Sequence, residues 1–188
     1  RGQRAVDWRL VDAVAKPQVF KDTVAKRASE LAAGSHRGAG QGVALTPIER
    51  RIDGDTISYK NVSIDISRGK RNATFLVKAP QGDQPKDIAG IEAAGVNWWP
   101  LAMARELDDA ILHMRTNELD IGTWILKTEG DSAAVLAADA TMEAHREHWF
   151  VNETIGMLRR TFARLDVSSR SLFALIEPGS CFAGTLAE

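Results

Sequence analysis

A turn of small residues near the end of the chain is the segment best suited to chemistry. Residues 177–184 read Glu-Pro-Gly-Ser-Cys-Phe-Ala-Gly and follow a short apolar run. Small residues let a ligand approach the backbone, and N–H groups at the start of a following helix carry positive potential. Such amides can stabilise the oxyanion that develops in acyl-thioester chemistry. The same pattern also fits a tight strand-to-helix turn without a ligand. The candidate binding residues in this turn are Gly179, Ser180, Cys181, Phe182 and Gly184.

A second turn follows the preceding apolar run and reads Thr-Glu-Gly-Asp over residues 128–131. Ligands of parallel crossover units bind beyond the carboxyl ends of the strands, where such turns meet. Gly130 and Asp131 are therefore added to the candidate oxyanion and thioester-binding residues.

Cys181 is the lone cysteine and admits two readings. As a nucleophile it needs a lowered thiol pKa, which a helix start can supply, and a base, which is usually histidine. His113, His145 and His148 are the candidate bases, although no motif places them. The other reading is a small buried thiol.

His145 and His148 are three residues apart, and a metal would need a third ligand such as Glu143 or Glu147. Because charged residues surround both histidines, a solvated helix face explains them better, and no metal site is predicted.

Trp98 and Trp99 form an unusual pair beside Pro100. They could line a pocket or an interface, or they could cap the core. The arginines at positions 159, 160 and 164 could meet phosphates of a nucleotide-bearing ligand, or they could lie on a solvated helix face.

Periodicity defines the elements that must position these residues. Helical spacing covers residues 1–33, 101–118 and 151–165, and residues 133–138 add at least one helical turn. A two-residue period from residue 56 predicts a strand with a bulge, then a turn at 67–70 and a strand through 74–77. Residues 34–55 read as a glycine-rich linker, with glycines at 34, 38, 40 and 42, and residues 80–97 read as a loop.

The last strands form a crossover unit in this reading. Residues 121–127 and 172–176 are short apolar strands, and the long helical connection between them predicts a parallel, right-handed pair. Residues 172–176 are apolar at every position, which suits a strand covered on both faces. Gly184 is expected to open a further helix.

Composition excludes several classes of function. The 188 residues carry 24 Lys+Arg and 25 Asp+Glu, so a net charge of −1 argues against nucleic acid as a partner. A single cysteine excludes an internal disulfide and a multi-cysteine metal site. Apolar runs stay short of 18 residues and no signal peptide is visible, so we expect a cytoplasmic protein without a membrane partner. The first residue is arginine rather than methionine, and we expect the chain to be an interior piece of a longer polypeptide.

Two stretches resemble the crotonase (enoyl-CoA hydratase) superfamily. Residues 1–14 with 20–32 resemble the closing strand and helix of that fold, whereas residues 172–184 resemble its central strand and oxyanion turn. A late segment that precedes an early one implies two tandem halves. The expected fold class is therefore mixed α/β, a partial crotonase-like ββα spiral with an N-terminal helical tail. Residues 1–33 would close a first half, residues 34–55 would be a linker, and residues 56–188 would begin a second half.

Within this superfamily the chain resembles the benzoyl-CoA-dihydrodiol lyase family over nearly its whole length. The segments that carry the resemblance are residues 97–101, 104–112, 114–120, 148–151, 153–160 and 166–184. The resemblance implies a lyase that opens the epoxidised ring of benzoyl-CoA in aerobic benzoate degradation, releasing formate and an open-chain semialdehyde CoA ester. It implies no metal or redox cofactor, with CoA present only as part of the acyl-CoA thioester substrate.

The resemblance also limits what the chain can do alone. The acid/base glutamates of the family fall outside this sequence, so the chain by itself is expected to be inactive. The implied partners are the remaining crotonase-like domain of the same polypeptide and further copies in a homo-oligomer. The alternative is a non-catalytic half that supports the fold or a dimer. Phe182, Thr185 and Pro178 depart from the usual glycine-rich oxyanion loop.

Overall fold

The computed structural model describes residues 2–35 and 42–188, and the chain divides into two compact units, residues 1–42 and 43–188. Each unit is described by itself. Arg1 and two glycines of the expected linker, Gly38 and Gly40, lie outside the described residues.

The first unit is helical, as predicted. It contains α1 (Gly2–Asp7), the 3-10 helix η1 (Pro17–Val19) and α2 (Phe20–Ala33). The closing strand expected between these helices is absent from the described residues, because residues 8–12 form a turn and bends. A strand needs a partner for its backbone groups, and the described part of this unit offers none. Phe20 and Leu31 on the apolar face of α2 are more than half exposed.

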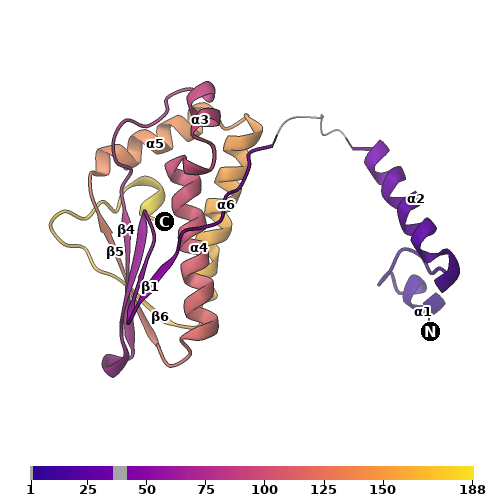
Figure 1. The fold of residues 1–188 in the computed structure, drawn as a ribbon, viewed down its shortest axis with the longest axis horizontal. Helices are drawn as coiled ribbons and strands as arrows, with labels where there is room; N and C mark the ends of the chain where they lie inside the picture. The colour runs from indigo at the N-terminus through magenta and orange to yellow at the C-terminus, as the bar shows by residue number, and fades with distance from the viewer. Residues whose placement is uncertain (1, 36–41) are drawn as a thin grey trace. The chain divides into compact units, whose positions relative to one another are not determined.

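The second unit is built on a sheet of six strands in sequential order (Figure 1). The first four strands are antiparallel, and β4, β5 and β6 are parallel. The strands are β1 (Arg51–Asp53), β2 (Thr56–Ser58), β3 (Val62–Ser67), β4 (Asn72–Lys78), β5 (Thr123–Glu129) and β6 (Ser171–Ala174).

The start of the sheet differs from the expectation in two ways. Strand β1 lies inside the range predicted to be linker, and the predicted bulge is a chain reversal between β2 and β3. There the Tyr59 N–H donates to the Val62 carbonyl at 2.9 Å. Ile57 and Ile64 are paired across the reversal, so both lie on one face and imitate the two-residue period of a single strand. The hairpin of β3 and β4 is as predicted.

Four α-helices complete this part of the described chain: α3 (Ile88–Ala94), α4 (Trp99–Asn117), α5 (Ser132–Ala144) and α6 (Trp149–Asp166). Figure 1 shows α4 and α6 side by side against the sheet. The apolar stripe predicted for α4 faces the core, since all four of its residues are buried: Ala104, Leu107, Ile111 and Met114. Residues 80–97 were expected to be a loop, but the Asp87 side chain caps α3 by accepting from Gly90 N–H at 2.8 Å.

The tryptophan pair belongs to the core. Trp98 and Trp99 are both buried, and the Trp98 ring centroid lies 5.9 Å from that of Phe150 on α6. The Trp99 indole N–H donates to the Lys78 carbonyl at 3.0 Å, which satisfies its one polar group. The core reading of this pair is therefore confirmed.

Strand β6 pairs in parallel with β5, which confirms the parallel pairing of the predicted crossover unit. The expectation that it is covered on both faces is wrong, because Phe173 is 60% and Ile176 75% exposed. It is the edge strand of the described sheet, so its outer side has no neighbour there. Gly184 opens only a 3-10 helix, η4 (Gly184–Leu186), rather than a longer helix. Within the described residues, none of the helices combines the length and apolar character needed to span a bilayer.

Candidate functional site

The two predicted turns meet at the carboxyl end of β5. The Gly130 N–H donates to the Gly179 carbonyl at 3.1 Å, so residues 128–131 and 177–184 lie in direct contact. On the other side, the Ala79 N–H after β4 donates to the Glu129 carbonyl at 2.9 Å. The end of β5 is thus joined to the end of β4 and to the chain that follows β6.

Gly130 is required for this junction. Its φ is +129°, a backbone conformation that residues other than glycine rarely adopt. A Cβ at this position would lie 2.6 Å from the Cβ of Ala79. A larger residue would therefore force the ends of β4 and β5 apart.

Several candidate amides are already used within the turn. The buried Cys181 donates its N–H to the Thr128 hydroxyl at 2.9 Å. The Ser180 N–H donates to the Glu177 carbonyl at 3.0 Å, and the Ser180 hydroxyl accepts from the Glu177 N–H at 2.9 Å. These amides hold the turn in shape and would need to exchange partners before they could bind an oxyanion.

Other candidates remain accessible to a ligand. Within residues 43–188, the amides of Phe182 and Gly184 have no hydrogen-bond acceptor. The Phe182 side chain lines a mainly apolar cavity of about 160 Å³, between the end of β5 and α6. Gly130 and Asp131 line a separate pocket of about 230 Å³ with residues that follow β4. The Asp131 carboxylate also caps α5 by accepting from the Ala133 N–H at 2.8 Å.

Asp139 is a site residue that the sequence reading missed. Its Oδ2 accepts from the Thr185 N–H at 2.7 Å, and a Cβ on Gly184 would collide with the same oxygen. Its Oδ1 is buried without a hydrogen-bond partner among the described residues. Burial raises the pKa of this carboxyl, against the opposing effect of the Thr185 amide. No local motif could have placed Asp139 here, because it lies 45 residues before Gly184 in the sequence.

The histidines do not assemble a nucleophilic site with Cys181. His113 contacts Asn117 on its own helix at 3.2 Å, His145 contacts the Lys86 carbonyl at 3.2 Å, and His148 lies 3.4 Å from Glu92. Cys181 is completely buried, and buried structural thiols are inert. The reading as a small buried thiol accounts for this residue.

The metal and phosphate hypotheses for the same region are not supported by a formed binding site in the described residues. In the part of the chain that the structure describes, no cluster of three or more His, Cys, Asp or Glu side chains is arranged to hold a metal ion. On α6, Arg164 pairs with Asp108 at 2.5 Å, whereas Arg159 lines a groove of about 610 Å³ beside Leu172.

The comparison with known proteins identifies one relative over the whole chain. The chain is 59% identical over 189 residues to benzoyl-CoA-dihydrodiol lyase of Aromatoleum evansii, and it spans 34% of that protein's length. No family model matches the chain. The resemblance to this lyase that the sequence predicts is therefore confirmed.

Proposed function

We propose that the protein to which this chain belongs is a ring-cleaving lyase that acts on the epoxide, or dihydrodiol, of benzoyl-CoA. The observation that carries the proposal is the 59% identity to benzoyl-CoA-dihydrodiol lyase, which extends over every part of the chain. In this proposal the enzyme works in aerobic benzoate degradation in the cytoplasm. It releases formate and an open-chain semialdehyde CoA ester, and it uses CoA only as part of the substrate.

The proposed architecture is a crotonase-like spiral begun by residues 56–188. The three parallel strands support it, because their carboxyl ends bring the turns at 128–131 and 177–184 together. Residues 1–33 would belong to a preceding crotonase-like half, joined by the linker. The remaining domain of the polypeptide and further copies in a homo-oligomer are the proposed protein partners.

The proposed contribution of this chain is to bind and orient an acyl-CoA thioester. The amides of Phe182 and Gly184 could hold a carbonyl oxygen, and Phe182 also lines the apolar cavity. Asp139 stands next to the same turn and would set its shape rather than exchange protons with the ring. The acid/base glutamates that the resemblance implies lie outside this sequence, so the chain orients the substrate without completing the reaction.

Formate release tests the proposal directly. The 188-residue chain should release no formate from the benzoyl-CoA epoxide, whereas a longer protein that contains it should do so. Full activity from these 188 residues would contradict the placement of the catalytic glutamates. Failure of the longer protein to release formate would overturn the proposed activity itself.

A structural or dimerisation half is the second candidate function. The exposed side chains of Phe173, Leu175 and Ile176 on and after the edge strand favour it, because they suit a protein interface better than water. Titration with benzoyl-CoA separates the two candidates. Saturable binding that shifts the amide resonances of Phe182 and Gly184 supports the thioester role, and absence of binding supports the structural one.

A further inference from the structure

A further pocket of about 810 Å³ lies away from the strand edge described above. Residues 46–51 form one wall, residues 58–60 form another, and the base comes from Val96, Asn97, Ala102, Arg105 and Glu106. We call it the basic pocket. Its volume is within the range of small-molecule sites, and all of its lining belongs to the unit of residues 43–188.

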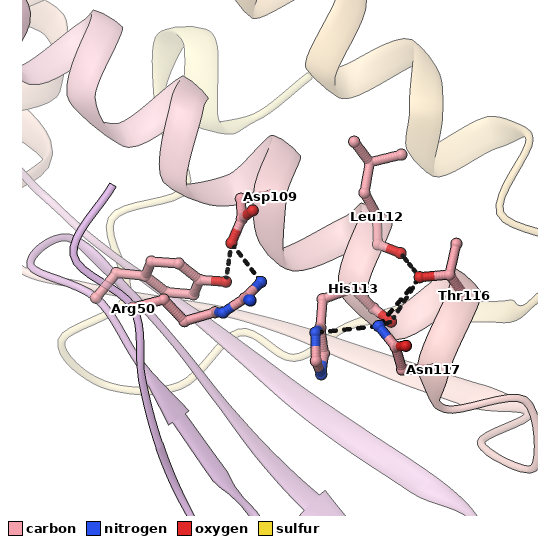
Figure 2. A network of polar contacts seen from close by, with 7 residues as sticks. Arg50, Asp109, Leu112, His113, Thr116 and Asn117 are labelled. Carbon is pink, nitrogen blue, oxygen red and sulfur yellow. Dashed lines mark hydrogen bonds and ion pairs between the residues drawn. The ribbon is translucent and has the colours of Figure 1, made fainter. Parts of the chain in front are cut away.

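One carboxylate fixes two walls of the basic pocket to α4. Arg50 Nη1 donates to Asp109 Oδ2 at 3.0 Å, as Figure 2 shows, and the Tyr59 hydroxyl donates to the same oxygen at 2.7 Å. Burial and the neighbouring Asp109 both raise the pKa of Tyr59, so the phenol remains a donor. The charge of Arg50 is therefore balanced within the protein.

Arg105 makes a second anchor but keeps most of its donors. Its Nη2 donates to the Thr46 carbonyl at 2.7 Å, which ties the wall of residues 46–51 to α4. A guanidinium carries five N–H donors in a planar fork. The described residues provide no carboxylate partner for this side chain, so its remaining donors are available to a ligand.

Lys60 adds one more cation to the lining, whereas the Arg51 side chain lies on the opposite face of the sheet from Arg50, because successive strand residues alternate. Among residues 43–188, no carboxylate lies within ion-pair distance of either one. Glu106, a buried carboxylate of the lining that attracts the charge of Lys60, accepts from the Asn61 backbone N–H at 2.6 Å and from the Asn61 side chain at 3.0 Å. Its oxygens are thus held by the β2–β3 turn, and Glu49, the other acid of the lining, is exposed.

We propose that the basic pocket binds a phosphate-bearing small molecule, whose phosphate oxygens are held by Lys60 and Arg105. Arginine and lysine are the residues that bind phosphate oxygens most effectively, and the pocket is too large for a single small anion. Asn97 also lines the pocket and offers a neutral amide. The site is distinct from the strand edge of the proposed thioester role, so neither proposal depends on the other.

Titration of the 188-residue chain with pyrophosphate, ADP and CoA tests the proposal at constant ionic strength. Calorimetry gives the affinity, and amide chemical shifts locate the ligand. Lys60→Gln and Arg105→Gln should each weaken binding of the tightest probe about tenfold. Arg115→Gln is the matched control, because it removes one positive charge from the same helix without lining the pocket, and it should change binding less than about twofold.

The three probes also identify the source of the phosphate. If pyrophosphate binds most tightly, the ligand is a free polyphosphate. If ADP binds most tightly, the ligand is a nucleotide. If CoA binds most tightly, the ligand is a CoA derivative bound outside the strand edge. Succinate bound as tightly as pyrophosphate would overturn the assignment to phosphate. The proposal fails if no probe binds at millimolar concentration, or if neither Lys60→Gln nor Arg105→Gln weakens binding. Among the described residues the Lys60 side chain makes no hydrogen bond or ion pair, so its variant remains informative even if Arg105→Gln loosens residues 46–51.

Discussion

At the scale of single residues, the predicted turn is held by hydrogen bonds that use its own amides. The Thr128 hydroxyl accepts from the buried Cys181 N–H at 2.9 Å. Thr128→Val keeps the shape of the side chain but leaves that amide without an acceptor, so we expect a loss of about 1–3 kcal/mol in the free energy of unfolding. Urea unfolding measures this difference.

The control is Thr116→Val, because this exposed hydroxyl bonds only to residues of its own helix. It donates to the Leu112 carbonyl at 2.8 Å and accepts from the Asn117 side chain at 3.1 Å, as Figure 2 shows. Its change should stay within about 0.5 kcal/mol. Equal effects of the two variants would show that the bond between Thr128 and Cys181 does not support the turn.

Two carboxyls should change stability with pH in opposite directions. Burial raises the pKa of Glu106 above its ordinary value of 4.5, although hydrogen bonds from Asn61 oppose the shift. The folded protein then binds a proton that the unfolded chain has lost, so this contribution to stability is lost as the pH rises through the raised pKa. The hydrogen bond from Arg68 lowers the pKa of Glu118, whose contribution is lost as the pH falls.

Urea unfolding between about pH 4 and pH 7 checks both signs against matched variants. The stability of the parent chain relative to Glu106→Gln should fall as the pH rises, whereas its stability relative to Glu118→Gln should increase. Two curves with the same slope would contradict the assignment of opposite shifts.

At the scale of elements, Asp131 has a clear structural role before any role in binding. Its carboxylate accepts from the Ala133 N–H at 2.8 Å and caps α5, whose start lies beside the pocket at the end of β4. Asp131→Ala should lower stability by about 1 kcal/mol, and Asp131→Asn should restore most of it, because asparagine caps equally well. Thermal unfolding by circular dichroism measures both.

Binding measurements on Asp131→Asn distinguish the charge of Asp131 from its role as a helix cap. If benzoyl-CoA binds at the strand edge and needs only the cap, Asp131→Asn will bind it as the parent does. A stable Asp131→Asn variant with lost binding would instead show that the carboxylate itself takes part.

The elements that could be predicted from the sequence are those with many residues on one buried face. Helix α4 shows a clear stripe through Ile111, and the parallel pairing of β5 and β6 follows from their connection. Helix α3 was missed because only Ile91 of its seven residues is buried, so it has almost no periodic signal. The reversal at Tyr59 could not be predicted, because Ile57 and Ile64 lie on the same face of the sheet. The two strands together therefore show the two-residue period of a single strand.

The candidate site was predictable in part for a related reason. The meeting of the two turns follows from the strand order, because carboxyl ends of parallel strands share one edge. The partner of each amide could not be predicted, because it depends on distant contacts. Asp139 reaches Thr185 and Thr128 reaches Cys181 through packing of β5, α5 and the last turn. The basic pocket joins residues 46–51 to α4 in the same way.

At the scale of the whole molecule, the two units differ in how much of each is buried in a core. The second unit has a continuous core that includes Ile64, Phe75, Trp98 and Met114, all buried. In the first unit, neither α1 nor α2 buries any side chain, and α2 has 14 residues. A helix of that length is marginal in water without tertiary packing.

The expected consequence is that residues 43–188 fold without residues 1–42. A chain shortened to 43–188 should retain the urea midpoint of the 188-residue chain, because its core comes entirely from its own residues. A peptide of residues 1–42 should show weak helical circular dichroism that increases with trifluoroethanol. A lower midpoint in the shortened chain would show that residues 1–42 stabilise the sheet unit through contacts of their own. An unchanged midpoint would leave the exposed apolar face of α2, with Phe20 and Leu31, available to another part of the full protein.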